Sequence, residues 1–317
     1  MNTRPLGKGG PGLTSVGFGA WAIGGPWTFG WGAVDDTESI RAIRQALDTG
    51  VNWIDTAASY GLGHSEVVVG KAVRGIRGGV FIATKCGLVP DGHGDMRRDS
   101  RPEGIRQEIE ESLRRLQTDY IDLYQIHWPD AAVPVEASWE VMARLRDEGK
   151  TRYIGVSNYD VPLLERCMKV TPVQSLQPPY SLLNRAADEE ILPFCAKNGI
   201  GVIAYSPMAS GLLTGRFDWG KVASDDWRRK FFTDEHITQA LAFVEKIRPL
   251  AARHRCTVGQ LAVGWVLHQP AVTSAIVGAR TALQAEENAG AADVDLTPED
   301  LAAIERHIAE SFSPATT

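Results

Sequence analysis

Short apolar segments alternate with helical patterns along almost the whole of this 317-residue chain. Each connection between successive extended segments is long enough for a right-handed crossover helix. The extended segments are expected at residues 16–18, 52–54, 81–84, 121–126, 153–156, 175–177, 202–205 and 274–277. The helical patterns cover 39–49, 65–73, 102–116, 135–148, 162–168, 189–197, 239–254 with 258–268, and 282–289. This alternation predicts one (β/α)8 barrel domain over residues 1–317, with a doubly wound open sheet as the alternative.

Three segments lie outside the alternation. Residues 7–12 match the spacing G-x-G-x-x-G, but they contain Pro11 and are followed by a strand-like segment, 13–18, where a dinucleotide motif needs a helix N-terminus. They therefore predict the turn of an N-terminal hairpin. Residues 206–233, after the seventh strand, form a loop long enough for a lid or binding element, with an ordinary surface excursion as the alternative. Residues 298–310 predict an extra C-terminal helix outside the barrel.

Charge and cysteine placement restrict the partners and the compartment. The net charge is -6, and no basic stripe is present to neutralise nucleic-acid phosphates. No apolar run is long enough to span a bilayer, and the first residues lack an apolar targeting segment. The four cysteines are scattered without a C-x-x-C pair, which favours reduced thiols. We expect a cytoplasmic monomer or weak homo-oligomer without a membrane or nucleic-acid partner.

Four polar residues follow the ends of successive predicted strands, where barrel enzymes carry their catalytic groups. Asp55, Lys85 and His127 come after three strands, and Tyr60 lies in the loop after Asp55. Each one alone could be a loop cap, a surface amine or barrel filling. Together, Asp55 would keep Lys85 charged, and that charge would lower the pKa of Tyr60 from about 10. Tyr60 could then donate a proton to a substrate oxygen that His127 orients by a hydrogen bond.

Reduction of a carbonyl group at this site would need a source of two electrons, and no side chain here supplies them. A cofactor that carries hydride is therefore expected. The seven histidines form neither an H-E-x-x-H pattern nor a cluster with cysteines, so no metal site is predicted. A G-x-S-x-G nucleophile motif is also absent from the sequence.

Three sequence blocks, in this order, resemble the aldo-keto reductase family. They read D-T-A-A-S-Y-G-L-G-H-S-E at 55–66, I-D-L-Y-Q-I-H-W-P-D at 121–130 and I-G-V-S-N-Y at 154–159. The sequence looks most like the bacterial general-stress and inositol-operon branch, which also reads H-W-P-D and G-L-L-T-G at these places. The resemblance implies the same barrel, a catalytic tetrad of Asp55, Tyr60, Lys85 and His127, and reversible NADPH-dependent reduction of aldehydes or ketones to alcohols.

The resemblance also implies an extended NADPH site across the barrel, without a Rossmann domain. Ser157, Asn158 and Gln177 would bind the nicotinamide carboxamide, and Tyr205 would stack on the ring. Arg280 is expected to take the 2′-phosphate, because the family's better-known Lys-Ser and Arg positions read differently here. NADPH is therefore favoured and NADH is possible. The further cofactor residues implied are Gly19, Ala20, Trp21, Ser206, Pro207, Gly211, Leu213, Gly215, Gly278, Gln284, Glu287 and Asn288.

Aromatic residues predict the substrate side. Trp21, Trp27, Trp31 and Trp128, with Tyr60, would form walls suited to a flat or sugar-like carbonyl compound, while simple packing of the barrel top is the alternative. The candidate substrates range from small aldehydes and keto-sugars to inosose-like rings and xenobiotic ketones. Two other functions stay open at this point: an NADPH-binding regulatory subunit of the same fold, and a barrel lyase or isomerase without nicotinamide.

Overall fold

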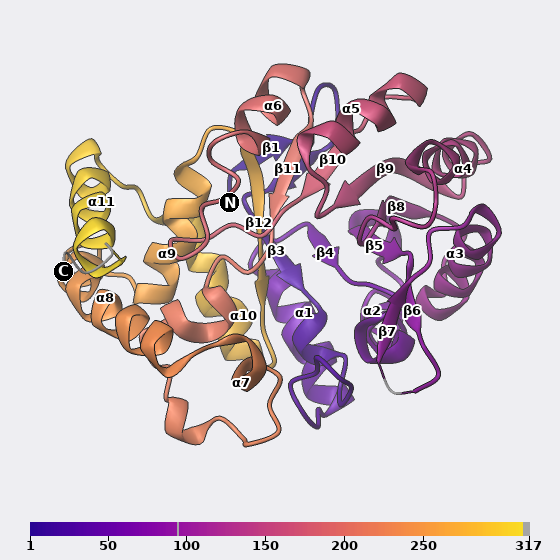
Figure 1. Ribbon diagram of the computed structural model, residues 1–317. Coiled ribbons are helices and arrows are strands. Elements are labelled where there is room, and N and C mark those ends of the chain that lie inside the picture. Colours follow the sequence, from indigo (N-terminus) through magenta and orange to yellow (C-terminus); the bar gives the residue numbers. More distant parts are fainter. Residues whose placement is uncertain (94, 313–317) are drawn as a thin grey trace.

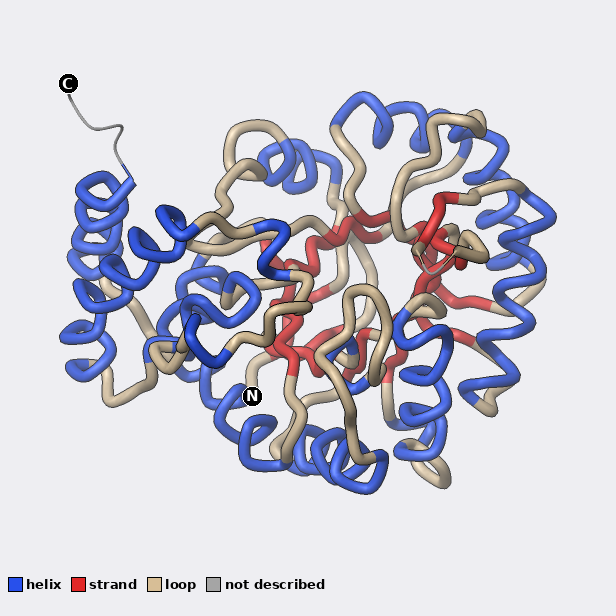
Figure 2. Tube along the Cα trace, turned by 60° about the horizontal axis from the view of Figure 1, so that its bottom comes forward, coloured by secondary structure: helices blue, strands red, loops and turns tan. Residues whose placement is uncertain are grey.

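The structure, a computed structural model, describes residues 1–93 and 95–312. Its parallel strands close into a barrel in the order β10-β11-β12-β3-β4-β5-β8-β9. Figure 2 shows these strands as a closed ring with the helices around it. The predicted (β/α)8 barrel is confirmed, and the open sheet is excluded. The strands are β3 (Val16–Gly19), β4 (Trp53–Asp55), β5 (Phe81–Cys86), β8 (Ile121–Ile126), β9 (Thr151–Ser157), β10 (Ser175–Gln177), β11 (Gly201–Ala204) and β12 (Val272–Gly278).

Helices cover the outside of the barrel because each presents an apolar face to the strands. In α3, for example, Ile105, Ile109 and Leu116 recur at helical spacing and are buried. Every predicted helical segment overlaps a helix of the structure. The helices are α1 (Asp36–Asp48), α2 (His64–Ala72), α3 (Pro102–Leu116), α4 (Val135–Asp147), α5 (Val161–Val170), α6 (Ile191–Asn198), the short α7 (Arg228–Phe231), α8 (Asp234–Arg253), α9 (Val258–His268) and α10 (Ala282–Ala289).

Additional elements lie at both ends of the barrel. The strands β1 (Thr3–Pro5) and β2 (Gly12–Thr14) form the predicted N-terminal hairpin. Gly7 in its turn has a φ of +67°, and a Cβ there would lie 2.7 Å from the carbonyl oxygen of Gly199, so only glycine fits. The C-terminal helix α11 (Pro298–Phe312) packs against α8, outside the barrel, as expected (Figure 1).

A second hairpin was not predicted. The strands β6 (Leu88–Pro90) and β7 (Met96–Arg98) pair antiparallel between β5 and α3. Each strand has three residues, which is too short for an alternating pattern to stand out. The hairpin extends the loop at the carboxyl end of β5, on the side where the polar residues gather.

The interior of the barrel is apolar at its amino end and polar at its carboxyl end. Leu6, Leu13, Trp53, Ala83 and Leu123 belong to one buried apolar cluster. Side chains two residues apart on a strand share a face. Therefore Asp55 points inward above Trp53, and Lys85 points inward above Ala83. The apolar cluster closes the amino end of the barrel, and the polar groups meet at the carboxyl end.

The described residues contain no helix that is both long enough and apolar enough to cross a membrane. The four cysteines are free thiols, as expected, and Cys86, next to Lys85, is buried.

Candidate active site

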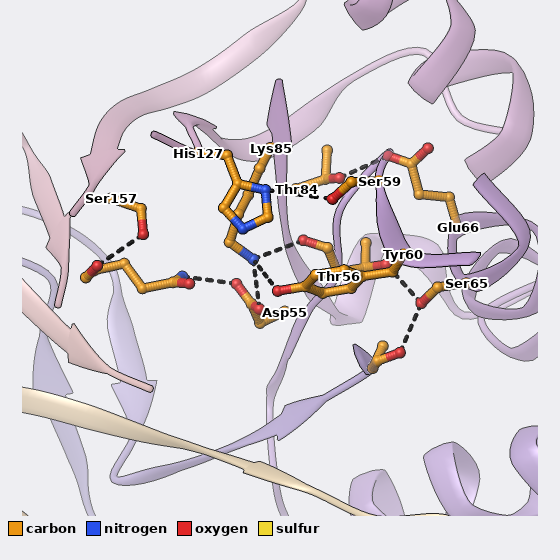
Figure 3. A network of polar contacts seen from close by, with 12 residues as sticks. Asp55, Thr56, Ser59, Tyr60, Ser65, Glu66, Thr84, Lys85, His127 and Ser157 are labelled. Carbon is orange, nitrogen blue, oxygen red and sulfur yellow. Dashed lines mark hydrogen bonds and ion pairs between the residues drawn. The ribbon is translucent and has the colours of Figure 1, made fainter. Parts of the chain in front are cut away.

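The four predicted catalytic side chains converge at the carboxyl end of the barrel (Figure 3). Asp55 ends β4, Lys85 lies near the end of β5, and His127 follows β8. Tyr60 begins a 3-10 turn, Tyr60–Gly63, in the loop after β4. The ring of Tyr60 lies edge-on to that of His127, with 5.8 Å between the centroids. Three neighbouring strands thus bring an acid, an amine, a phenol and an imidazole into one cluster.

The ammonium group of Lys85 uses all its protons within this cluster. Its Nζ atom donates to Oδ2 of Asp55 at 2.7 Å and to the carbonyl oxygen of Thr56 at 2.9 Å. It also donates to the hydroxyl oxygen of Tyr60 at 3.2 Å. A lysine has three N–H donors, so none is left for another partner. Because the Tyr60 oxygen accepts from Lys85, its own proton stays available to a ligand.

The electrostatics of Tyr60 differ from the prediction. Burial raises the pKa of Tyr60 well above 10, and the negative charge of Asp55 adds to this effect. Burial also lowers the pKa of Lys85, although the Asp55 charge opposes that shift, and burial raises the pKa of Asp55 against the pull of Lys85. The expected lowering of the Tyr60 pKa is therefore wrong: desolvation of the phenol outweighs the neighbouring cation. Tyr60 keeps its proton at neutral pH, as a proton donor must.

His127 is neutral in this environment. Burial lowers its pKa well below 6.5, and the nearby positive charge of Lys85 acts in the same direction. Its Nδ1 atom lies 3.4 Å from the hydroxyl oxygen of Ser59. With Ser59 as the donor, the single ring proton of His127 is on Nε2, where it can be donated to a substrate oxygen.

Asn158 joins three loops around the site. Its Nδ2 atom donates to the carbonyl oxygen of His127 at 2.9 Å and to Oγ of Ser157 at 3.0 Å. Its Oδ1 atom accepts from the hydroxyl group of Tyr205 at 2.9 Å. Asn158 has a φ of +63°, a strained value for a residue with a side chain, and Ser206 has a φ of +55°. Such strain is concentrated at functional sites, where surrounding contacts hold it in place.

Two clefts meet at Tyr60. The first has a volume of about 350 Å³ and extends between the loop after β11 and the helices α9 and α10. The second has a volume of about 780 Å³ and lies between that loop and the β6–β7 hairpin. The residues that line both clefts are Trp21, Tyr60, Tyr205, Ser206 and Ser210.

Most of the predicted cofactor residues line the first cleft. The set comprises Gly19, Trp21, Tyr205, Ser206, Pro207, Gly211, Gly278, Arg280, Gln284, Glu287 and Asn288. Sequence reasoning missed Arg216, Thr257 and Gln260 in the same wall. Six predicted residues do not line this cleft. Ala20, Leu213 and Gly215 line neither cleft, and Ala20 and Leu213 are fully buried. Ser157, Asn158 and Gln177 line the second cleft.

The first cleft fits an extended dinucleotide. It contains two guanidinium groups, those of Arg280 and Arg216, which suit phosphates. Arg280 donates to the carbonyl oxygen of Ala33 at 2.7 Å, so its orientation is fixed, and Arg216 pairs with Glu287 across the cleft. Gly19 lies at the inner end, where a Cβ would lie 2.8 Å from Cγ2 of Ile276. Among the described residues, no group of three or more His, Cys, Asp or Glu side chains could hold a metal ion.

The second cleft has the aromatic walls expected of a substrate site. Of the tryptophans predicted on the substrate side, Trp27 and Trp128 line this cleft, with the shared Trp21. Trp31, also predicted on the substrate side, lines the first cleft and not the second. Its ring packs edge-on against Trp21, with centroids 5.7 Å apart, and under the Arg228 guanidinium, 4.6 Å from the ring centroid. Ser157, Asn158 and Gln177 also line this second cleft. The residues not predicted here include Phe29, Arg98, Trp227, Phe231 and Phe232.

Known proteins match this chain over almost its whole length. The sequence model of the aldo/keto reductase family covers residues 15–309. Aldo-keto reductase YhdN of Bacillus subtilis (strain 168) is 43% identical over 277 residues, which span 86% of this chain and 82% of YhdN. The NADH-specific methylglyoxal reductase of Escherichia coli (strain K12) is 36% identical over 328 residues, which span 98% of this chain and 99% of that protein.

Solved structures share the architecture. The glycerol dehydrogenase AKR11B4 from Gluconobacter oxydans has a TM-score of 0.89 and 37% identity, with 99% of this chain and 97% of that chain covered. An aldo-keto reductase from Klebsiella pneumoniae in complex with NADPH has a TM-score of 0.74 and 29% identity, with 96% and 95% covered. With the family match extending from the first barrel strand into the C-terminal helix, this chain belongs to the aldo/keto reductase family.

Proposed function

We propose that this protein reduces aldehyde or ketone carbonyls to alcohols, reversibly, with NADPH as the electron source. One observation carries the proposal: the hydroxyl group of Tyr60, bound by Lys85, lies where the two clefts meet. A dinucleotide in the first cleft and a carbonyl compound in the second would both reach this hydroxyl group. The reduced nicotinamide, when bound, would supply the hydride that no side chain can supply.

The tetrad would handle the proton. Tyr60 donates the proton of its hydroxyl group to the carbonyl oxygen and is left as a phenolate. Lys85 already donates to that phenolic oxygen, so the new negative charge forms beside an ammonium group. His127 donates from Nε2 to the same carbonyl oxygen and orients it. In alcohol oxidation Tyr60 takes the proton back.

Asp55 would act through Lys85. Its Oδ2 atom accepts from Lys85, and its Oδ1 atom accepts from Nε2 of Gln177 at 2.8 Å. Both carboxylate oxygens are therefore occupied, and the carboxylate has a fixed direction. Burial lowers the pKa of Lys85, and the positioned negative charge of Asp55 opposes that shift.

The dinucleotide would lie along the first cleft with its adenosine end near α10. We assign the 2′-phosphate to Arg280, because a guanidinium group binds a phosphate through two parallel hydrogen bonds. The Klebsiella relative in complex with NADPH supports this preference. NADH stays possible, since the Escherichia coli relative is named as NADH-specific. Tyr205, which lines both clefts, is proposed to border the nicotinamide where the clefts meet, with Ser157, Asn158 and Gln177 on the side of the second cleft.

The proposed setting is a cytoplasmic protein that acts on small molecules as a monomer or weak homo-oligomer. The net charge of -6 argues against a nucleic-acid partner. We favour turnover over a purely regulatory role, because Tyr60 and His127 border an open cleft with a volume of about 780 Å³ rather than a filled one.

Binding and turnover can be tested in sequence. Addition of NADPH is expected to quench the tryptophan fluorescence, because Trp21 and Trp31 line the first cleft. A carbonyl panel should then give a substrate-dependent fall in the absorbance of reduced nicotinamide, which Tyr60→Phe slows by about 10²- to 10⁴-fold. Quenching without turnover of any carbonyl would favour a regulatory subunit. Absence of quenching with both NADPH and NADH would refute the cofactor assignment.

A further inference from the structure

The charge of the second cleft is not explained by reduction of a neutral carbonyl. Arg98 is the one lysine or arginine among the described residues that line this cleft. The two arginines of the first cleft, Arg216 and Arg280, lie on the dinucleotide side. Arg98 is therefore a cation on the substrate side, separate from the groups that the cofactor phosphates would use.

Arg98 is held beside the catalytic loop. It ends β7, and its guanidinium carbon lies 5.3 Å from the ring centroid of Trp128, the residue after His127. Its Nη1 atom donates to the carbonyl oxygen of Pro129 at 3.3 Å. A cation that stacks on an indole keeps a defined place and leaves its remaining N–H groups free to bind a ligand.

Arg98 has no ion-pair partner among the described residues, and one carboxylate, that of Asp95, lines the same cleft. Its neighbours Arg97 and Arg101 both pair with Asp99, at 2.8 and 2.7 Å, whereas Arg98 forms no ion pair with any described residue. The carboxylate that lines the same cleft, Asp95, accepts from the backbone nitrogen of Met96 at 2.8 Å. Arg97 and Arg101, which do not line the cleft, are thus each paired with a carboxylate, whereas Arg98, which lines it, has no ion-pair partner among the described residues.

We propose that the second cleft binds carbonyl compounds that carry an anionic group, a carboxylate or a phosphate, which Arg98 binds at the rim while the carbonyl group reaches Tyr60. This inference rests on the proposed reductase function and narrows its substrate class. Arginine suits the task because its planar fork binds the two oxygens of a carboxylate or phosphate together.

The test compares matched substrates that differ in charge. 4-Carboxybenzaldehyde is set against its neutral methyl ester, and glyceraldehyde 3-phosphate against glyceraldehyde. The wild-type enzyme is expected to have the higher kcat/KM for the anionic member of at least one pair, and the responding pair identifies the carboxylate or the phosphate. Arg98→Gln should lower the anionic-to-neutral ratio of kcat/KM by about 10- to 100-fold, mainly through KM. Arg98→Lys should restore part of the ratio.

Arg97→Gln is the matched control, since Arg97 neighbours Arg98 and pairs with Asp99 outside the cleft. It should leave the ratio of the wild type. Two results would overturn the inference: a wild type without anionic preference in either pair, or equal losses for both members of a pair in Arg98→Gln, which would mark Arg98 as a purely structural support for Trp128. Turnover of the neutral aldehydes would still support the reductase function in these cases, whereas turnover of no carbonyl would refute that function itself.

Discussion

The ammonium nitrogen of Lys85 lies 2.7 Å from Oδ2 of Asp55, and both side chains are buried at the carboxyl end of the barrel. The pair lies above an apolar cluster that includes Trp53 and Ala83. Burial of charged groups costs free energy unless counterions and hydrogen bonds satisfy them. The backbone carbonyl group of Thr56 and the amide group of Gln177 complete this pair. The result is a cation fixed under the phenol of Tyr60.

Replacement of Asp55 by asparagine should change the pH dependence of the reaction. The Asp55 charge raises the pKa of Lys85, so its removal lowers that pKa further and Lys85 loses its proton at a lower pH. We expect the alkaline decline of kcat/KM to move toward neutral pH in Asp55→Asn. The measurement is a pH profile between about pH 6 and pH 10. A uniform loss of activity, with the profile unmoved, would contradict the role given to Asp55.

Replacement of Tyr60 by phenylalanine should remove the proton donor and leave the clefts in shape. We expect kcat to fall by about 10²- to 10⁴-fold, which is the usual contribution of a positioned general acid. The dissociation constant of NADPH, followed by tryptophan fluorescence, should stay near that of the wild type. Tyr153→Phe is a suitable control, because Tyr153 packs against the apolar cluster at the other end of the barrel. Wild-type turnover in Tyr60→Phe would refute the assignment.

Replacement of Arg280 by alanine should weaken the binding of NADPH but not that of NADH. The loss of a bidentate phosphate contact is expected to raise the dissociation constant of NADPH by about 10- to 100-fold. NADH lacks the 2′-phosphate, so its dissociation constant should change little and serves as the internal control. Titration of both reduced cofactors against wild type and variant checks this. An unchanged affinity for NADPH would mean that a residue other than Arg280 binds the 2′-phosphate.

Glu108 should make the stability depend on pH. Burial raises its pKa from 4.5 to about 7, helped by the charges of Asp99 and Glu66, while its hydrogen bond from the backbone nitrogen of Gly87 acts against the shift. The folded state therefore holds this proton more tightly than the unfolded state. The stabilisation of the folded state by this proton is fully present below about pH 4.5 and is lost as the pH rises to about 7.

The variant Glu108→Gln stays neutral and keeps an oxygen for the Gly87 nitrogen. Its free energy of unfolding should exceed that of the wild type at pH 8 by up to about 3 kcal/mol, with little difference at pH 4. Denaturant unfolding at both pH values measures the difference. An equal effect at both pH values would mean that packing, and not ionisation, explains the change.

The barrel could be predicted from the sequence because strand and helix periodicities recur through the chain. The segments 121–126 and 175–177 were located to the residue, since β8 and β10 are uninterrupted buried strands. The β6–β7 hairpin was missed, because its short strands are half exposed and follow no repeating pattern. The likeness to one bacterial branch and the individual substrate stay predictions.

The site was predictable in position but not in detail. Asp55, Lys85 and His127 could be placed together, because parallel strands of a barrel end on one side. The direction of the Tyr60 pKa shift could not be predicted, since it depends on how completely the fold desolvates the phenol. The place of Trp227 and Phe231 in the second cleft could not be predicted either, because loop conformation decides which aromatic side chains line a cleft.

The two clefts are built largely from different segments, and they share five residues around Tyr60. Gln284 and Arg280 border only the first cleft, and Trp128 and Arg98 border only the second. The molecule is thus modular: nucleotide choice and carbonyl scope can diverge or be re-engineered independently. A library confined to the β6–β7 hairpin should diversify substrates without disturbing coenzyme use, and one confined to α10 should do the converse.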